Sequence, residues 1–443
     1  MKHTVTIEKI ISGGKGLART AEGQVIMTPF TLTGENVVAS ETSKKSGYLE
    51  GRLDTILSPS PARINASCPF YGECGGCDVQ HGSYAEQLKI KRGIVAESLQ
   101  RAKVAVENVE DTLASPVQWG YRYRLRLKIS PAGQLGFFKK RSNTFLLISS
   151  CPVASKGIRA AVDELNKSGV LEYFAEKYPE LELLESPADG KITLVLRGNK
   201  HKGKQKRPPT AVLQKLTHLS SIHQVGLISG KRFHYLSSQA EPLRQDIRFE
   251  EKSCSLSWSG GCFSQVNPGQ NEQLITLVCE LIGDLGGKTV LDLYCGMGNF
   301  SAALGLLGGT VTGIEGNQEG IWWAEKNAER AGITARFFVA DVRFALQQIV
   351  AQEEKADYVL LDPPRSGVGK SITLVPHIEP EKIIYVSCNP ATLARDLNLL
   401  SPHGYTITRV VPVDMFPQTS HIETVVLLER CQSPKSPLHA LVC

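Results

Sequence analysis

LDLYCGMGNF at residues 291–300 is the stretch that decides the fold. An apolar strand runs here into a turn with Gly296 and Gly298, and a helix follows, so a ligand can approach the backbone closely. Such a turn alone is weak evidence. Dinucleotide-binding proteins carry a third glycine three residues after the second, where this chain has Ser301. The phosphate-binding sequence of nucleoside triphosphatases, G-x-x-x-x-G-K-[ST], does not occur in the chain.

Short apolar strands alternate with helical stretches around this turn, from about residue 256 onward. The pattern predicts an α/β fold, with a doubly wound parallel sheet that binds its ligand at the carboxyl ends of the strands. A short polar segment separates the last two strands, which indicates an antiparallel pair closing the sheet edge. The expected strands cover residues 289–293, 310–314, 335–339, 358–361, 383–387, 407–413 and 424–428.

Acidic residues at the ends of the second and third strands predict a nucleoside pocket. Glu315 lies 19 residues past Gly296, where a carboxylate can accept hydrogen bonds from two ribose hydroxyls. Asp341 is placed to accept a hydrogen bond from an adenine amino group. Because the triphosphatase and dinucleotide signatures are missing, S-adenosylmethionine is the ligand that the pattern favours.

The tetrapeptide DPPR at residues 362–365 lies at the end of the fourth strand. Its two prolines stiffen a backbone without N–H donors, so carbonyl groups and Asp362 face the expected pocket. The tetrapeptide resembles that of amino-directed methyltransferases and does not decide which atom is methylated. An amino-directed DNA methyltransferase is therefore an alternative, but it leaves the position of Cys388 unexplained.

Cys388 follows the fifth strand and is expected on the same rim as the cofactor. A thiolate that adds to C6 of uracil turns the ring into an enolate, whose C5 can attack a sulfonium methyl group. A base must then take the C5 proton, and Glu423 at the start of the last strand is the candidate. A single cysteine is more often buried and inert. Its position at a strand end, together with Glu423, favours the nucleophile.

Length, composition and charge are those of a globular protein with several domains. The chain has 443 residues, of which 42% are hydrophobic and 21% charged, and its net charge is +6. Single cores stop growing at about 250–300 residues, so two or three domains are expected. The small basic excess permits an anionic partner without requiring one. No long apolar run and no signal-peptide core occur, so we expect a cytoplasmic protein without a membrane span.

Residues 1–58 alternate apolar positions with glycine turns, which predicts a small antiparallel barrel. Small barrels of this type often bind oligonucleotides, and a purely structural add-on domain is the alternative. Pro59 and Pro61 indicate the linker that follows. The expected strands cover residues 5–10, 16–19, 24–28, 36–40 and 48–57.

Eleven unevenly spaced cysteines argue against a disulfide framework. Three of them, Cys68, Cys74 and Cys77, crowd together in a pattern that indicates a metal site. Zinc and iron–sulfur clusters both use thiolate ligands, and the spacing alone does not choose between them. A helix is expected to follow over residues 84–102, and it can pack on the domain that begins near residue 251.

A basic strand is expected after this helix, because positively charged and apolar residues alternate strictly over residues 121–129. RNA or DNA backbone is a natural ligand for such a face, and a solvated sheet face is the alternative. The run KHKGKQKR at residues 200–207 predicts a basic loop that adds non-specific attraction. The basic face consists of Arg122, Arg124, Arg126 and Lys128.

Taken together, these motifs resemble the RNA uridine-5 methyltransferases over nearly the whole chain. The resemblance implies an α/β protein with a Rossmann-like class I methyltransferase domain at 251–430. It also implies an N-terminal OB-like TRAM barrel that binds RNA at 1–58, an iron–sulfur α+β central domain that binds RNA at 59–250, and a tail at 431–443. The segments that carry it, in the family's order, are FSQVN at 263–267, LDLYCGMGNF at 291–300, DPPR at 362–365, SCNP at 387–390 and HIET at 421–424.

The resemblance also implies the role of each site residue. Cys388 would be the nucleophile and Glu423 the base. Tyr294 stands where many members carry Phe, and either ring can pack on the cofactor. The S-adenosylmethionine site would be lined by Gln265, Tyr294, Asn299, Glu315, Asp341 and Asp362. A structural [4Fe–4S] cluster would be held by Cys68, Cys74, Cys77 and Cys151.

The expected reaction is methylation of uridine C5 in 23S rRNA through a covalent bond between Cys388 and C6. The uridine would be flipped out of the RNA, with Phe263 stacked on the extruded base. A TRAM barrel combined with a cluster resembles the ribosomal branch of the family, and tRNA is the alternative substrate. A non-catalytic RNA-binding or assembly factor is an alternative of another class, against which Cys388 and Glu423 argue. No membrane and no obligate protein partner is expected.

Overall fold

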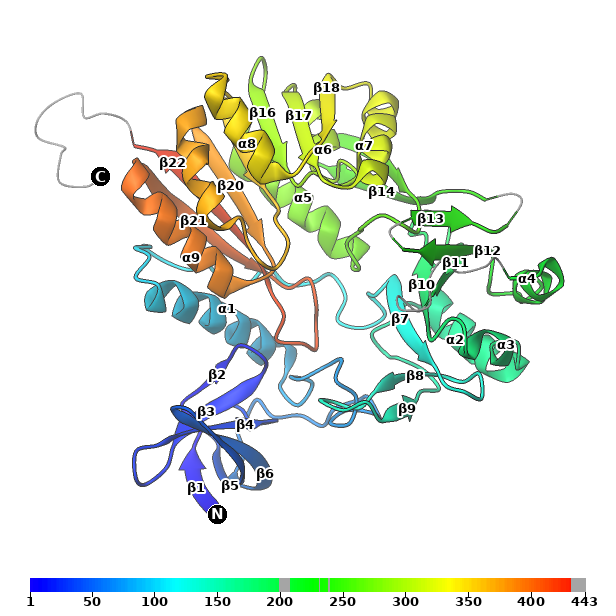
Figure 1. Cartoon of the computed structure of the whole chain (residues 1–443). Coiled ribbons are helices and arrows are strands. Elements are labelled where there is room, and N and C mark those ends of the chain that lie inside the picture. The colour runs from blue at the N-terminus through cyan, green and yellow to red at the C-terminus, as the bar shows by residue number, and fades with distance from the viewer. Residues whose placement is uncertain (199–207, 231, 238–239, 432–443) are drawn as a thin grey trace, which may run out of the picture.

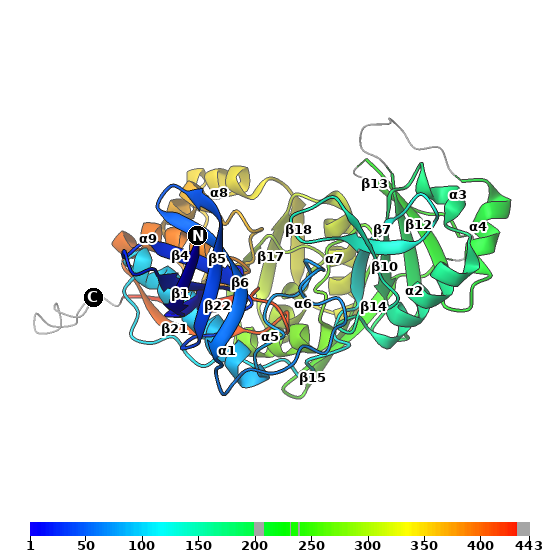
Figure 2. The same ribbon diagram turned by 90° about the horizontal axis from the view of Figure 1, so that it is seen from below.

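The computed structural model describes residues 1–198, 208–230, 232–237 and 240–431, which form three parts (Figure 1). In this view a small N-terminal sheet lies at the lower left, a central part lies at the right, and the C-terminal part lies above both. Figure 2 shows the N-terminal sheet and the central part toward opposite ends of the molecule. The expected basic loop at 200–207 and the expected tail beyond residue 431 lie outside the described residues.

The N-terminal sheet has six strands in the order β1-β5-β6-β4-β3-β2, around buried side chains such as Ile26 and Val37. Its pairs are antiparallel except β4 with β6, which departs from the expected all-antiparallel barrel. The expected strand at 5–10 is two strands, because the N–H groups of Ile7 and Glu8 bond to carbonyls elsewhere. The strands are β1 (Lys2–Thr6), β2 (Lys9–Ile11), β3 (Lys15–Arg19), β4 (Val25–Pro29), β5 (Asn36–Lys45) and β6 (Tyr48–Ser58).

Helix α1 (Tyr84–Arg101) lies between the N-terminal sheet and the C-terminal part (Figure 1). Ile90 and Ile94 join the apolar core of the N-terminal sheet. Val95 and Leu99 join a core of the C-terminal part. The helix therefore packs on the C-terminal part, as the sequence allowed, and one amphipathic element fixes two parts relative to each other.

The central part is built on a seven-stranded sheet in the order β13-β12-β11-β10-β7-β8-β9. The expected basic strand corresponds to β7, which pairs antiparallel with β8. The strands are β7 (Arg124–Ile129), β8 (Leu135–Phe138), β9 (Phe145–Leu147), β10 (Glu180–Glu185), β11 (Ile192–Arg197), β12 (Gln224–Ser229) and β13 (Arg232–Tyr235). The helices are α2 (Lys156–Ser168), α3 (Glu172–Ala175) and α4 (Thr210–Thr217).

The basic face of β7 is largely paired within the protein. Strand β10 brings Glu182 beside Arg124, with 2.7 Å between Nε and Oε1, and Arg197 binds the other carboxylate oxygen at 2.6 Å. Burial raises the pKa of Glu182, but the two guanidinium groups outweigh it and lower the value to about 2. Lys128 is paired with Glu180 in the same way. The face is therefore not the wholly solvated one that the sequence left as an alternative.

A hairpin of β14 (Leu243–Phe249) and β15 (Lys252–Trp258) precedes α5 (Pro268–Ile282). Ile247 and Leu256 of the hairpin are buried in the same apolar core as Leu274 of α5. The expected domain boundary at residue 250 therefore falls in the turn of a hairpin whose two strands both pack on the C-terminal part.

The C-terminal sheet has seven strands in the order β18-β17-β16-β19-β20-β22-β21. The first five are parallel, and β22 is antiparallel to β20 and to β21. The doubly wound sheet with an antiparallel pair at its edge is thus confirmed. The strands are β16 (Thr289–Leu293), β17 (Thr310–Glu315), β18 (Ala335–Val339), β19 (Tyr358–Leu361), β20 (Lys382–Ser387), β21 (Tyr405–Val413) and β22 (Glu423–Arg430).

Apolar cores lie on both faces of this sheet, and helices cover them (Figure 1). In β20, Ile383 and Tyr385 belong to one core while Ile384 and Val386 belong to the other, as the alternation of a strand requires. Within the described residues, no helix is long and apolar enough to cross a membrane. The helices are α6 (Ser301–Leu306), α7 (Gln318–Ala331), α8 (Val342–Ala351), η1 (Gly369–Ile378), α9 (Pro390–Leu400) and η2 (Ser401–His403).

Candidate active site

A small pocket lies at the turn that follows β16. Tyr294 adopts a left-handed φ of 67°, and Gly296 and Gly298 are left-handed as well, at 56° and 82°. This tight backbone, unusual for a tyrosine, turns the chain sharply from the strand toward α6. The described residues around the pocket are Phe263, Ser264, Gln265, Tyr294, Cys295, Gly296, Met297, Asn299, Phe300 and Asp362. Four of the six expected cofactor residues thus line one pocket.

Asn299 is oriented by a residue that sequence reasoning missed. Its side-chain amide exchanges two hydrogen bonds with that of Asn271, at 2.9 and 3.0 Å. Asn271 lies buried on α5. The pair leaves each amide one further donor and one further acceptor position, so Asn299 can still bind a ligand in the pocket.

Glu315 and Asp341 lie at the ends of the next two strands, outside the lining of this small pocket. Glu315 ends β17, and its Oε1 accepts a hydrogen bond from the backbone of Asn317 at 2.8 Å. Asp341 caps α8 by accepting from the N–H groups of Arg343 and Phe344. Both carboxylates therefore keep oxygen positions for a ligand along the same edge of the sheet.

The fully buried Asp292 and the partly buried Asp362 determine the charge at the carboxyl ends of these strands. Burial raises the pKa of Asp292 to about 7, and the charge of Glu315 adds to the effect. Burial likewise raises the pKa of Asp362 to about 7, reinforced by Asp292 and Glu315. Asp292 accepts a hydrogen bond from Ser301 at 2.5 Å, while its other oxygen, Oδ1, has no partner among the described residues. Such a cluster favours a cationic ligand.

Asp292 was not among the expected site residues. Its signal in the sequence is a carboxylate in the middle of the otherwise apolar strand β16, directly before the glycine turn. A buried acid costs free energy unless something compensates its charge, so this position pointed to a ligand or to a functional group.

Cys388 lies in the turn between β20 and α9. Asn389 caps α9, and its Nδ2 donates a hydrogen bond to the Arg365 carbonyl at 3.0 Å. This contact holds the turn of Cys388 against the Asp362–Arg365 turn. Burial raises the pKa of the half-buried Cys388 thiol to about 11, with Glu423 and Asp362 adding to it and Arg365 opposing it.

Glu423 opens β22, where it pairs in register with Val413 of β21, and only 5% of it is exposed. Burial raises its pKa well above the usual range, the charge of Asp362 adds to this, and Arg365 opposes it. The pairing of Ser387 with Thr424 places Cys388 and Glu423 at the same end of β20 and β22, and the bond of Asn389 to the Arg365 carbonyl brings the turn of Asp362, which lines the pocket, beside them. A thiol nucleophile, an acid–base group and a cation are the parts that covalent catalysis with proton removal requires.

A second cavity, of about 180 Å³, is lined by Cys68, Cys74, Cys77 and Cys151. Burial raises the pKa of the Cys77 thiol to about 12, and the three other cysteines add to the effect. All four cysteines therefore line one cavity. Among the described residues, no group of three or more His, Cys, Asp or Glu side chains is arranged to hold a single metal ion.

Comparison with known proteins now assigns a family. The family model described as tRNA (Uracil-5-)-methyltransferase matches residues 83–431. The chain belongs to this family. Members are RNA uracil-C5 methyltransferases, so the resemblance stated from the motifs is confirmed.

Relatives in this family match the chain over its full length. The 23S rRNA (uracil(1939)-C(5))-methyltransferase RlmD of Shewanella frigidimarina is 32% identical, covering 97% of this chain and 96% of its own. An uncharacterized RNA methyltransferase of Halalkalibacterium halodurans is also 32% identical, with 96% of each chain covered. The solved Pyrococcus abyssi tRNA (uracil-54, C5)-methyltransferase in complex with S-adenosyl-L-homocysteine has a TM-score of 0.72 and 25% identity, covering 96% of this chain and 99% of that one.

Family membership decides between the reaction classes left open by the sequence. The protein is an S-adenosylmethionine-dependent RNA (uracil-C5)-methyltransferase. It is therefore neither an amino-directed DNA methyltransferase nor a non-catalytic RNA-binding factor. The expected α/β methyltransferase fold with an N-terminal β-sheet is confirmed as well.

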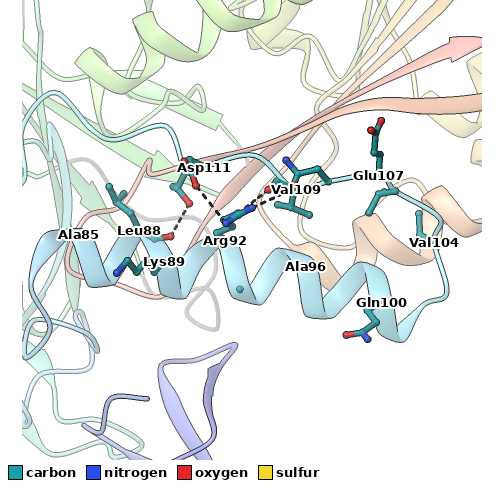
Figure 3. Close-up of a pocket in the computed structure, with 14 residues that line it drawn as sticks. Ala85, Leu88, Lys89, Arg92, Ala96, Gln100, Val104, Glu107, Val109 and Asp111 are labelled. Atoms are coloured by element: carbon teal, nitrogen blue, oxygen red, sulfur yellow. Dashed lines mark hydrogen bonds and ion pairs between the residues drawn. The ribbon is translucent and has the colours of Figure 1, made fainter. Parts of the chain in front are cut away.

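A wide surface groove of about 950 Å³ lies away from this site, between α1 and the segment 104–112 (Figure 3). Arg92 spans it, donating hydrogen bonds to the Val109 carbonyl at 2.8 Å and to Asn108 Oδ1 at 3.2 Å. Its described walls carry both signs of charge and include none of the expected site residues. The groove is therefore not part of the methyl-transfer site.

Proposed function

We propose that this enzyme methylates C5 of a uridine in 23S rRNA, with Cys388 as nucleophile and Glu423 as base. The observation that carries the proposal is the register of β20 and β22. Ser387 pairs with Thr424, so Cys388 and Glu423 lie at the same end of neighbouring strands, and Asn389 bonds the Arg365 carbonyl beside them. This end of the sheet also borders the pocket lined by Gln265, Tyr294 and Asn299.

S-adenosylmethionine would be held along the carboxyl ends of the strands. Gln265, Tyr294, Asn299 and Asp362 would contact its methionine portion, because they line the pocket at the glycine turn. Glu315 would accept from the ribose hydroxyls and Asp341 from the adenine amino group, since β17 and β18 follow in order. When bound, the cofactor supplies a methyl group on a sulfonium centre. The raised pKa values of Asp292 and Asp362 support a cation at this place.

In the proposed reaction Cys388 forms a temporary bond to the uracil ring, and Glu423 removes the C5 proton. The Cys388 thiolate forms a bond to C6, and the electron pair of the C5–C6 double bond moves onto the uracil carbonyl as an enolate. C5 would then bond to the methyl carbon of the bound cofactor, whose carbon–sulfur bond breaks to leave a neutral thioether. Glu423 as carboxylate removes the C5 proton, the double bond returns, and the C6–sulfur bond breaks to release Cys388.

Cys388 and Glu423 can act only in their deprotonated forms. Burial raises the pKa of the Cys388 thiol to about 11 and that of the Glu423 carboxyl well above its usual range, so burial favours the neutral form of both groups in the free enzyme. Each must lose its proton before it acts, as nucleophile and as base. Arg365 favours the charged form of both, so it supports the thiolate and the carboxylate once RNA displaces water from the edge.

The N-terminal sheet and the central part would bind the RNA. Phe263 is 68% exposed beside the cofactor pocket, where an aromatic ring can stack on an extruded base. Arg126 on β7 lies 3.8 Å from Glu182, a longer ion pair than the 2.7 Å one of Arg124, and half of its side chain is exposed. A phosphate group would find its charge available.

The four cysteines Cys68, Cys74, Cys77 and Cys151 would hold a [4Fe–4S] cluster. Four thiols around one cavity of about 180 Å³ fit the ligand set, and Phe70, Leu125 and Phe137 give the cavity apolar walls. A cubane spaces its ligands more widely than a single zinc ion, whose bonds to sulfur are about 2.3 Å. When bound, the cluster would cross-link segment 68–77 to Cys151.

Purification tests the cluster directly. The protein should be brown, absorb broadly in the visible blue, and contain iron and sulfide in equal amounts. Replacing Cys77 by serine should remove the colour, because a hydroxyl is a poor ligand for iron–sulfur clusters. A colourless protein with stoichiometric zinc would contradict the assignment.

Ribosomal RNA is favoured over tRNA as substrate by the relatives. RlmD of Shewanella frigidimarina, named for 23S rRNA, is 32% identical over nearly the full chain, whereas the tRNA enzyme of Pyrococcus abyssi is 25% identical. The test is methyl transfer from labelled S-adenosylmethionine to unmodified 23S rRNA and tRNA transcripts, followed by nucleoside analysis. Labelled 5-methyluridine in 23S rRNA alone is expected. The same label in tRNA alone would keep the chemistry and overturn the substrate.

A further inference from the structure

The segment between β21 and β22 delivers Glu423 to the site and is itself buried. Asp414, Gln418, Thr419 and Ser420 are all nearly inaccessible to solvent. Gln418 has a left-handed φ of 72°, which a residue with a side chain adopts only when contacts around it enforce the conformation. The position of Glu423 therefore depends on its pairing with Val413 and on whatever holds this segment, residues 414–422.

Asp78 holds the end of the segment that lies nearest Glu423. Its Oδ1 accepts a hydrogen bond from the backbone N–H of Ser420 at 2.6 Å, and its Oδ2 accepts from the Ser420 hydroxyl at 2.8 Å. The N–H groups of Asp78 and Val79 donate in return to the Gln418 carbonyl, at 3.2 and 3.3 Å. Four hydrogen bonds thus join residues more than three hundred positions apart in the chain.

Other contacts hold the earlier part of the same segment. Lys91 of α1 forms a buried ion pair with Asp414 and donates to the Phe416 carbonyl at 3.0 Å. Gln87 of α1 exchanges two hydrogen bonds with Gln418, at 3.1 and 2.9 Å. These anchors lie five or more residues before Glu423, whereas Ser420 lies only three before it. Asp78 is therefore placed to fix the orientation of Glu423 itself.

We infer that Asp78 is a positioning residue for Glu423, and that the cysteine-bearing segment thereby sets the geometry of proton removal. The inference rests on the proposed role of Glu423 as base. A general base must reach its proton at hydrogen-bond distance, so a small displacement costs rate at that step. Because Asp78 follows Cys77 directly, the segment that carries three of the four cysteines is also the one that fixes the base.

The same geometry predicts that loss of Asp78 does not slow the steps before proton removal. Cys388 sits in a different turn, held by the hydrogen bonds of Asn389 and Thr392 to the Arg365 carbonyl. Asp78 makes none of those contacts. Loss of Asp78 should therefore leave addition of Cys388 and methyl transfer largely intact, while slowing removal of the C5 proton and release of the RNA.

The test compares Asp78→Ala, Asp78→Asn and Asp357→Ala in the full-length, cluster-loaded protein. Asparagine can still accept from the Ser420 N–H through Oδ1 and donate to its hydroxyl, so it should rescue most of the function. Asp357 is a matched control at the amino ends of the parallel strands, opposite the carboxyl ends where the site lies. It accepts from the N–H and the hydroxyl of Thr289, at 2.7 and 2.8 Å, and touches nothing near the site.

The readouts are kcat, KM for S-adenosylmethionine, the covalent protein–RNA adduct on a denaturing gel, and the isotope effect with 5-deuterated uridine in a 23S rRNA transcript. Asp78→Ala should lower kcat by about tenfold to a hundredfold. KM should change little, the adduct should accumulate, and the deuterium effect on kcat should increase. Asp78→Asn and Asp357→Ala should resemble the unmodified enzyme in adduct level and isotope effect.

Two results would overturn the inference in distinguishable ways. If Glu423→Gln accumulates adduct but Asp78→Ala loses activity without adduct or isotope effect, Asp78 serves only folding or RNA binding. If Glu423→Gln itself accumulates no adduct, Glu423 is not the base and the proposed function fails with it. If Asp78→Ala does not fold, Ser420→Ala replaces it in the test. This variant removes only the hydroxyl contact, so it should show the same changes in kcat, adduct level and isotope effect, but smaller ones.

Discussion

At the scale of single residues, burial decides the chemistry of the site more than sequence position does. Asp292 and Asp362 are ordinary acids placed where water is scarce and other carboxylates are near, so their pKa values rise to about 7. A bound cation would reverse that shift. The site is thus electrostatically prepared for a ligand with a sulfonium and an ammonium group.

Binding of S-adenosylmethionine should accordingly depend on pH. Above pH 7 both carboxyl groups are charged and attract the cation, whereas below it they are protonated and the attraction is lost. Affinity measured by calorimetry should fall as the pH decreases through about 7, and binding near that value should release protons. Asp292→Asn should reduce the proton release. An affinity independent of pH between 6 and 8 would contradict this electrostatic account.

At the scale of elements, helix α1 joins the N-terminal sheet to the C-terminal part and fixes their relative position. It contributes to the core of the N-terminal sheet and to a core of the C-terminal part. Its Lys91 and the facing Asp414 are both fully buried, and burial of Lys91 lowers its pKa against the opposing effect of Asp414. A buried pair of this kind specifies position more than it stabilises the fold.

Removing one member of the pair should therefore destabilise more than removing both. Lys91→Met leaves the Asp414 carboxylate buried and unpaired, which typically costs about 3–5 kcal/mol. The double variant Lys91→Met/Asp414→Leu should recover much of that loss, since no charge is left in the core. Chemical unfolding of the two single variants and the double variant measures the coupling. Additive effects of the two substitutions would show that the pair is not coupled.

At the scale of the whole molecule, the sequence predicted the C-terminal sheet well because its signals are local. Apolar strands that lead into the turn of Gly296, into Glu315 and into Asp362 mark the carboxyl ends of the sheet without reference to any distant segment. The hairpin of β14 and β15 was not predicted, because the alternating LRQDIRF of β14 indicates a half-exposed strand but not which core it joins. The boundary was therefore placed in its turn.

Contacts between distant segments account for what the sequence could not reveal. The ion pair of Arg124 with Glu182 needs the pairing of β7 and β10, 58 residues apart, so the basic face could not be identified as internally paired. The bonds of Asp78 to Ser420 join segments 342 residues apart. Cys388 and Glu423 were named from their motifs, whereas the residues that hold them in place became apparent only from the fold.

The most direct test of the account is covalent trapping with Glu423→Gln. Incubated with S-adenosylmethionine and an unmodified 23S rRNA transcript, this variant should accumulate a methylated protein–RNA adduct that survives a denaturing gel, because the C5 proton cannot leave. The double variant Cys388→Ala/Glu423→Gln should form none while still binding RNA. An adduct that persists without Cys388, or no adduct with Glu423→Gln, would contradict the roles assigned to the two residues.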